Sequence, residues 1–254
     1  MSTCCPAVME PPRESAGGQV TAKTYNNTSL FVAGPTKSTA GVLAFPDVLG
    51  ATSGRIKKDA EALGRLGYAV AIVDLTDGDW VTPVTMDTLD DWLTKFTIES
   101  IEPNIRAAIE YLEKEAGVTS ISSYGYCWGG WVGAALSTLP HPVIKGHVSF
   151  HPSWKVEEMQ KGEGAVEKMA ERITVPQLLL SAGNDPENVR EGGSVKKILK
   201  AKSGVVGELS NVQDFPDVIH GWVNRGDLED PTIKANVMKA WHAAIEFTQT
   251  VNPL

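Results

Sequence analysis

The sequence of 254 residues is poor in cysteine and holds only Cys4, Cys5 and Cys127. Adjacent Cys4 and Cys5 cannot easily bond each other, and an odd number of cysteines does not make a disulfide framework. The count favours a reducing compartment, so we expect a cytoplasmic protein. No histidine lies near the Cys4–Cys5 pair, so no metal site is expected there.

The chain also lacks long apolar runs and an excess of basic residues. No window approaches the roughly 18 apolar residues of a membrane span, and residues 1–18 have neither the basic start nor the apolar centre of a secretory signal. The formal net charge of −8 repels phosphate backbones and anionic lipids, so neither nucleic acids nor membranes are expected as partners. Prolines and glycines in residues 1–18 predict a flexible arm, and residues 19–254 one folded domain.

Beyond the arm, short apolar runs alternate with segments of helical periodicity. The continuous apolar runs are typical of parallel strands that are covered on both faces, whereas in the helical segments apolar residues recur every three or four positions. Strands are predicted at residues 30–33, 41–45, 68–73, 120–124, 144–150, 175–181 and within 208–215. Helices are predicted at residues 53–66, 98–112, 129–138, 195–202 and after 230–231. A long irregular loop is predicted at residues 74–88. The pattern predicts a single-domain α/β protein whose mostly parallel sheet has helices on both faces, with a ligand crevice beyond the carboxyl ends of the strands.

One of these strand ends carries a candidate nucleophile. Gly125-x-Cys127-x-Gly129 lies between a predicted strand and a predicted helix, which is the pattern of a nucleophile elbow with cysteine in place of serine. The turn brings strand and helix close together, so the residues two before and two after the nucleophile must be tiny. It also places Cys127 at a helix N-terminus, which favours the thiolate over the thiol.

In proteins with this turn, an acid and then a histidine follow the nucleophile along the chain. Asp185 follows the predicted strand at 175–181, and His220 follows the next one, so the gaps are 58 (185 − 127) and 35 (220 − 185) residues. The histidine must reach the thiol, and the carboxylate must orient the imidazole and stabilise its positive charge. Asp214 and Asp217 are rival acids, but they lie too close to His220 to stand at a separate strand end.

The remaining histidines are weaker candidates for the base. His141, His147 and His151 precede Asp185, and His242 neighbours Trp241 on the last predicted helix, where a surface position is expected. His151 stands at the end of the strand at 144–150, so it either lines the pocket or caps the strand.

These motifs resemble those of a known family. Gly125-Tyr-Cys-Trp-Gly-Gly130, Gly183-Asn-Asp185 and His220-Gly-Trp-Val-Asn-Arg225 are similar to the corresponding segments of the dienelactone hydrolases, also called carboxymethylenebutenolidases, within the α/β-hydrolase superfamily. The likeness runs from about residue 41 to the C-terminus. The run Phe150-His-Pro-Ser153 resembles the eukaryotic branch most closely. The resemblance implies hydrolysis of a lactone or a related ester without metal or organic cofactor.

The resemblance also implies roles for further residues. Asp47 stands where the family has an acidic residue, a glutamate in bacterial members, that modulates the catalytic thiol. The main-chain N–H groups of Val48 and Trp128 would form the oxyanion hole, which for Trp128 the elbow geometry also suggests. Arg225 falls where the family holds a substrate carboxylate, a task that suits a bidentate guanidinium. The family's second substrate arginine has no counterpart in the 74–88 loop, and this weighs against dienelactone itself.

The hypothesis from sequence is therefore a cysteine-nucleophile hydrolase that cuts an ester or lactone through an acyl-thiol. Trp222 and His151 are predicted to join Arg225 in binding the small-molecule substrate, with Trp80 and Trp154 as further aromatic candidates that are individually more typical of core. A monomer or homodimer is expected. A non-catalytic module that binds a small acid or lactone, and a thioester-handling or acyl-transfer enzyme, are the alternatives.

Overall fold

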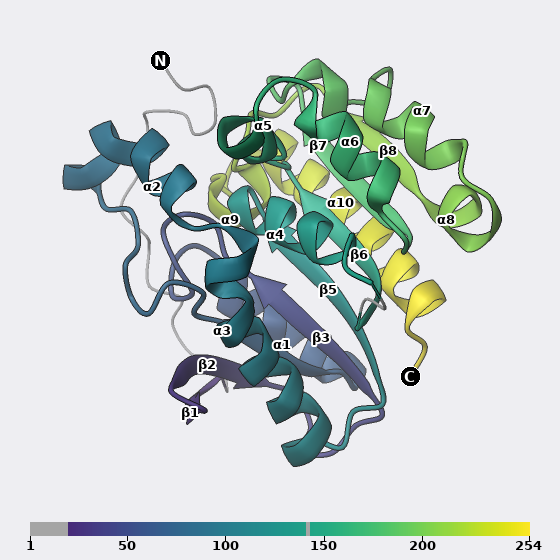
Figure 1. The fold of residues 1–254 in the computed structure, drawn as a ribbon. Coiled ribbons are helices and arrows are strands. Elements are labelled where there is room, and N and C mark those ends of the chain that lie inside the picture. The colour runs from purple at the N-terminus through teal and green to yellow at the C-terminus, as the bar shows by residue number, and fades with distance from the viewer. Residues whose placement is uncertain (1–19, 141–142) are drawn as a thin grey trace.

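The computed structural model describes residues 20–140 and 143–254, which form one eight-stranded sheet in the order β1-β2-β4-β3-β5-β6-β7-β8. β1 pairs antiparallel with β2 and β2 antiparallel with β4, whereas all pairs from β4 to β8 are parallel. The strands are β1 Thr21–Tyr25, β2 Thr28–Ala33, β3 Ala40–Phe45, β4 Ala69–Val73, β5 Ser120–Tyr126, β6 Ile144–Phe150, β7 Gln177–Ala182 and β8 Asn211–Phe215 (Figure 1).

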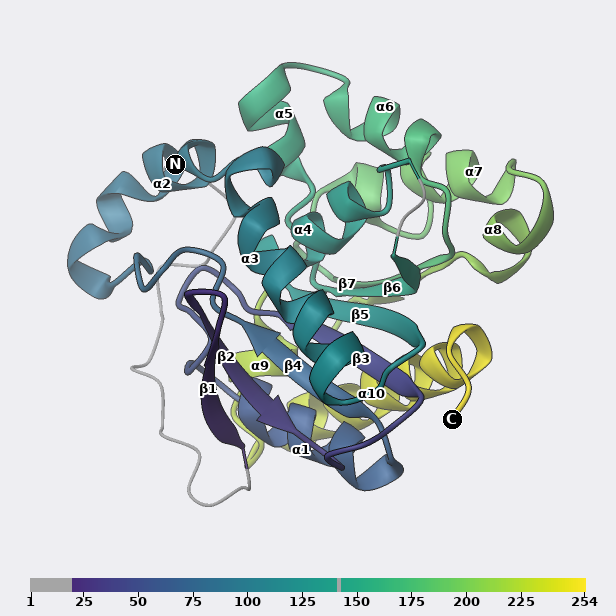
Figure 2. The same cartoon turned by 60° about the horizontal axis from the view of Figure 1, so that its bottom comes forward.

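Helices cover both faces of this sheet, as Figure 2 shows. The α-helices are α1 Ile56–Leu66, α2 Leu89–Lys95, α3 Ile98–Glu110, α4 Trp128–Leu136, α5 Lys155–Lys161, α6 Ala165–Arg172, α7 Ser194–Lys200, α8 Gly204–Leu209, α9 Trp222–Arg225 and α10 Pro231–Val251. Three further helical segments, of the 3-10 or π type, are η1 Pro83–Thr88, η2 Tyr111–Glu115 and η3 Glu187–Val189. None of the helices in the described ranges is long and apolar enough to cross a membrane.

Two hydrophobic cores lie on the two faces because side chains alternate along each strand. In β3, Leu43 and Phe45 pack with α3 and α4 on one face. Val42 and Ala44 pack with α1, α9 and α10 on the other. Central strands buried on both sides read as continuous apolar runs, which is why β3 and β4 were predictable from sequence.

The predicted fold class is confirmed: a mostly parallel sheet with helices on both faces. The helix expected from residue 53 begins at Ile56, because Gly54 has a φ of 64° in the left-handed region. The loop expected at 74–88 ends in the helical turn η1. The predicted arm at 1–18, with Cys4 and Cys5, and His141 lie outside the described residues.

One strand and five α-helices had no counterpart in the sequence prediction: β1, α2, α5, α6, α8 and α9. The edge strand β1 has exposed side chains and therefore carries no apolar pattern. The helices α5 and α6 have seven and eight residues and are separated at Gly162 and Gly164, so each is too short for a clear periodic stripe.

The packing at the end of β5 generates a stability prediction. A Cβ atom at Gly125 would lie 2.1 Å from the carbonyl oxygen of Gly129, a main-chain atom that cannot swing aside. We expect Gly125→Ala to lower the free energy of unfolding by at least about 1–3 kcal/mol, the usual cost of overpacking. Gly192→Ala is the matched control, because a Cβ there meets nothing within 4 Å. Urea titration compares the two variants, and equal stability would contradict the packing described.

Candidate active site

The turn between β5 and α4 holds Cys127 in a strained conformation. Its φ of 54° and ψ of −113° are rarely adopted by residues with a side chain. The chain passes so close to its neighbours that a Cβ at Gly129 would lie 2.3 Å from the carbonyl oxygen of Phe45. With Gly125 packed against Gly129, both glycines of the Gly-x-Cys-x-Gly pattern are sterically required.

The loop after β6 fixes Cys127 from both sides. The N–H of Cys127 donates to the carbonyl of Phe150 at 3.1 Å, and its carbonyl accepts from the N–H of Ser153 at 3.1 Å. The hydroxyl oxygen of Ser153 lies 3.2 Å from the sulfur of Cys127, and both residues are buried. Sequence reasoning did not single out Ser153, although it ends the Phe150–Ser153 run on which the family resemblance partly rested.

Asp185 and His220 meet at the ends of the next two strands. Asp185 follows β7 and His220 follows β8, and Oδ1 of Asp185 lies 2.6 Å from Nδ1 of His220. Oδ2 of Asp185 accepts from the N–H of Ala182 at 2.7 Å, and the N–H of His220 donates to Oδ1 of Asn184 at 2.6 Å. The carboxylate and the histidine loop are thereby both anchored to the turn after β7.

The rival acids lie elsewhere. Asp214 lies within β8, where it pairs with Arg190 at 3.4 Å and accepts from the N–H of Glu191 at 2.8 Å. Asp217 lines the cavity described below. The structure therefore brings Asp185, and not Asp214, to the imidazole of His220.

The charges around His220 act strongly on its imidazole. Burial alone would lower the pKa of His220, but the negative charges of Cys127 and Asp185 outweigh burial and raise the pKa to about 10. At neutral pH this favours an imidazolium between a thiolate and a carboxylate.

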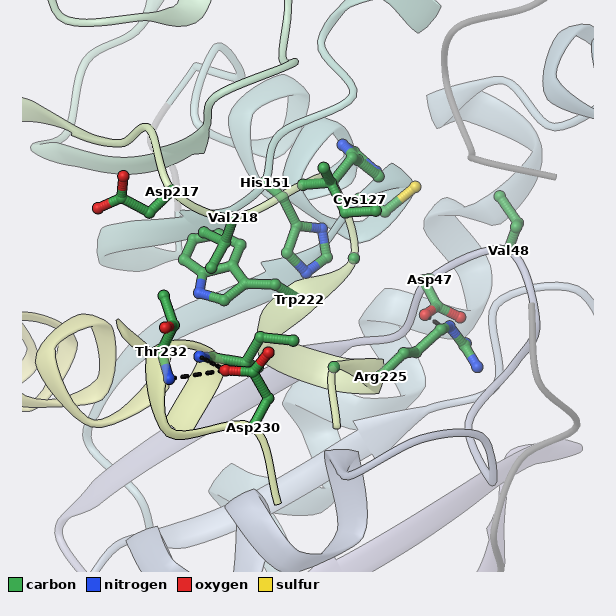
Figure 3. Close-up of a pocket in the computed structure, with 15 residues that line it drawn as sticks. Asp47, Val48, Cys127, His151, Asp217, Val218, Trp222, Arg225, Asp230 and Thr232 are labelled. Atoms are coloured by element: carbon green, nitrogen blue, oxygen red, sulfur yellow. Dashed lines mark hydrogen bonds and ion pairs between the residues drawn. The ribbon is translucent and has the colours of Figure 1, made fainter. Parts of the chain in front are cut away.

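Cys127 and His220 stand on the wall of a cavity of about 420 Å³ beyond the carboxyl ends of the strands, as expected for this fold (Figure 3). All of the predicted site residues except Trp128 and Asp185 line it directly. Its lining comprises Asp47, Val48, Cys127, His151, Asp217, Val218, Ile219, His220, Gly221, Trp222, Arg225, Gly226, Asp230, Thr232 and Ile233. The described residues hold no group of three or more histidine, cysteine, aspartate or glutamate side chains arranged to hold a metal ion.

Asp47 and Arg225 face each other on one side of this cavity (Figure 3). Oδ2 of Asp47 accepts from the guanidinium of Arg225 and, at 2.8 Å, from the side-chain amide of Asn224. Its other oxygen, Oδ1, accepts from the N–H of Leu49 at 2.9 Å. The residue predicted to modulate the thiol is therefore an ion-pair partner of the residue predicted to hold a substrate carboxylate.

Arg55, which sequence reasoning missed, holds the segment that carries Arg225. Its guanidinium donates to the carbonyls of Trp222 at 2.8 Å, Val223 at 3.0 Å and Gly226 at 2.7 Å, all in or next to α9. Carbonyl groups at a helix end favour a nearby cation, so the half-buried guanidinium of Arg55 stabilises the short α9.

The predicted oxyanion groups belong to the first residue of α4 and to the loop after β3. Trp128 begins α4, and the N–H groups of a first helical turn have no partner within the helix. Its indole ring is fully buried, 4.9 Å between centroids from Trp92, so the side chain of Trp128 is not available to a ligand. Val48 lines the cavity in the loop after β3, and its carbonyl accepts from the N–H of Val81 at 2.9 Å.

The other predicted aromatic and histidine residues divide between cavity and core. Trp222 and His151 line the cavity. Trp154 and His147 are buried core residues, Trp80 packs half-buried beside Trp128, and His242 is exposed on α10. His151 therefore lies in the pocket and not only at the end of its strand.

Comparison with known proteins points to one family. The model of the dienelactone hydrolase family matches residues 29–252. The carboxymethylenebutenolidase homolog of Xenopus tropicalis is 27% identical over 201 residues, which cover 77% of this chain and 75% of that protein. The homolog of Rattus norvegicus is 23% identical over 193 residues, or 75% and 74% of the two chains.

Solved structures share the fold. A dienelactone hydrolase-like promiscuous phosphotriesterase from metagenomic libraries superposes with a TM-score of 0.65 at 18% identity, covering 92% of this chain and all of the other. With the family match spanning most of the chain, this protein belongs to the dienelactone hydrolase family.

Proposed function

We propose that the protein hydrolyses an ester or a lactone, with Cys127 as the nucleophile. The observation that carries the proposal is the buried thiol and imidazole on the wall of one cavity, with the carboxylate of Asp185 2.6 Å behind the imidazole and the thiol at a strained strand–helix turn. Membership of the dienelactone hydrolase family supports hydrolysis of such a bond. The scarcity of cysteine supports a cytoplasmic location, which we propose with it.

The first step is acylation of the thiol. The thiolate of Cys127 attacks the substrate carbonyl, and the N–H groups of Val48 and Trp128 stabilise the oxyanion that forms. As the carbon–oxygen bond of the ester breaks, the leaving oxygen takes the proton from Nε2 of His220. The products of the step are an acyl-thiol on Cys127 and a neutral imidazole.

The second step is hydrolysis of the acyl-thiol. Once Cys127 is acylated, its negative charge no longer raises the pKa of His220, and burial then acts against the imidazolium. The neutral imidazole takes a proton from water, and the hydroxide attacks the thioester. The returning thiolate again favours the imidazolium, so the state of the nucleophile sets whether His220 serves as acid or base.

The nucleophile is tested by replacement. We expect Cys127→Ala to abolish turnover of an aryl ester without loss of folding, because no acyl-thiol can form. Cys127→Ser should keep a small fraction, since an alkoxide forms less readily than a thiolate beside the same histidine. Steady-state kinetics and circular dichroism give the result, and wild-type turnover in Cys127→Ala would exclude the mechanism.

The acid and the base are tested with a matched carboxylate. Asp185→Asn and His220→Ala should each lower kcat/KM by at least about 100-fold, as for misoriented or missing bases. Asp214→Asn is the control, because Asp214 is a carboxylate of the neighbouring strand β8 that pairs with Arg190 and not with His220. The same loss in Asp214→Asn as in Asp185→Asn would overturn the assignment of the acid.

The coupling between thiolate and imidazole is tested by nitrogen NMR of His220. A pKa raised above its ordinary value falls when the negative charge that raises it is removed. In Cys127→Ala we therefore expect the imidazole of His220 to lose its proton at a lower pH than in the wild type, where the pKa is about 10. Identical titration of His220 in the two proteins would show that the thiol carries no charge at rest.

A further inference from the structure

Each positively charged side chain on the cavity wall is paired with a negatively charged group, and the other charged side chains on the wall are acidic. Apart from His220, which stands between Cys127 and Asp185, the only cation among the described lining residues is Arg225. Arg225 is 15% exposed and pairs with Asp47, which is 4% exposed. The wall therefore has no uncompensated positive charge with which to receive an anion.

Two further carboxylates add negative charge to the same wall. Asp217 lines the cavity after β8, and Asp230 lines it at the start of α10, where its side chain accepts from the N–H groups of Thr232 and Ile233. A carboxylate on the substrate would enter a cavity whose fixed charges repel it, and because Asp217 and Asp230 are exposed this repulsion is strongest at low salt. The wall thus disfavours an anionic substrate.

The polar groups that the wall does offer carry no charge. Both ring nitrogens of His151 and the indole nitrogen of Trp222 are buried without a hydrogen-bond partner among the described residues. A buried polar atom left unpaired costs free energy, so such atoms on a cavity wall indicate a ligand that pairs with them. Burial and the cation of His220 hold the pKa of His151 well below its ordinary value, which leaves one donor and one acceptor on the ring.

The imidazole of His151 is held firmly in this position. The backbone of His151 has a φ of 40°, a strained value for a residue with a side chain, and its N–H donates to the carbonyl of Leu180 at 2.8 Å. The ring stacks on Tyr126 with 5.8 Å between centroids, and the hydroxyl of Tyr126 donates to Asp59 at 2.5 Å. Figure 3 shows the ring of His151 between Cys127 and Trp222, and its centroid is 4.8 Å from that of His220.

We propose that the substrate is an uncharged ester or lactone and that His151 hydrogen-bonds a polar group next to its scissile carbonyl. This inference rests on the proposed hydrolase function and narrows its substrate class. His151 is a specificity residue that pairs with substrate, and the Asp47–Arg225 pair keeps a carboxylate out of the place where the family resemblance would put one.

Three nearly isosteric probes test the substrate class. They are an unsaturated lactone bearing a carboxamide, its carboxylate analogue and its isopropenyl analogue, each compared by kcat/KM corrected for spontaneous hydrolysis. In the wild type we expect kcat/KM for the carboxamide to exceed that for the carboxylate at least about 10-fold, because the negative charge of the carboxylate is repelled by the acidic side chains on the cavity wall. We expect kcat/KM for the carboxamide to exceed that for the isopropenyl lactone about 2- to 10-fold, which is the usual effect of one uncharged hydrogen bond.

Variants of His151 and Asp47 test which residue causes each of these two preferences. His151→Phe should erase the preference for carboxamide over isopropenyl, while His151→Asn, which keeps a donor and an acceptor and tolerates a positive φ, should retain part of it. Asp47→Asn should raise kcat/KM for the carboxylate relative to kcat/KM for the carboxamide, because the substitution removes the anionic partner of Arg225. If His151→Phe does not fold, the nitrogen resonances of His151 in the wild type are followed instead, and we expect them to shift when the ring-opened carboxamide binds.

The outcomes separate this inference from the proposed function. If the wild type has a kcat/KM for the carboxylate that equals or exceeds its kcat/KM for the carboxamide, the proposal of an uncharged substrate is overturned. An unchanged carboxamide preference in folded His151→Phe, or unshifted resonances of His151 in the wild type, overturns the role of His151. In either case an acyl adduct on Cys127 still supports the hydrolase, whereas the absence of turnover and adduct with all three probes would instead contradict the proposed function.

Discussion

Cys127 occupies a strained turn between β5 and α4, and the rest of the site is arranged around it. The turn exists because Gly125 and Gly129 leave no side chain between the strand, the helix and the end of β3. The loop after β6 then binds both main-chain groups of Cys127 through Phe150 and Ser153. Four parallel strands thus end in one place, so side chains distant in sequence meet at one cavity.

The cations at this cavity occur in partnered groups. His220 stands between Cys127 and Asp185, and Arg225 is paired with Asp47. The first group changes during the proposed reaction, because acylation removes the charge on sulfur. The second stays paired, so in our account it excludes a carboxylate. Recognition of substrate is then left to uncharged groups, above all to His151.

Sequence predicted most of the sheet and the candidate site because both depend on local signals. The apolar runs of β3 and β4 and the glycines around Cys127 reflect burial and close packing at those very residues. The order of Cys127, Asp185 and His220 along the chain follows from the succession of parallel strand ends, and the structure brings Asp185 to His220 at 2.6 Å.

Features that depend on partners far apart in sequence could not be predicted in this way. Arg55 binds the carbonyls of α9 about 170 residues away, and no sequence pattern near Arg55 predicts this contact. The pairing of Asp47 with Arg225 likewise joins two loops that local patterns treat separately. Likewise, the unpaired nitrogens of His151 become visible only when everything around that ring is known.

The most direct test of the central claim is the mass of the protein during turnover. In His220→Ala the second step lacks its base, so a reactive aryl ester should leave a stable acyl group on the enzyme, and peptide mapping should place it on Cys127. An acyl group on any other residue, or ester cleavage by the wild type with no acyl-enzyme under rapid quench and no adduct in His220→Ala, would contradict cysteine-nucleophile catalysis.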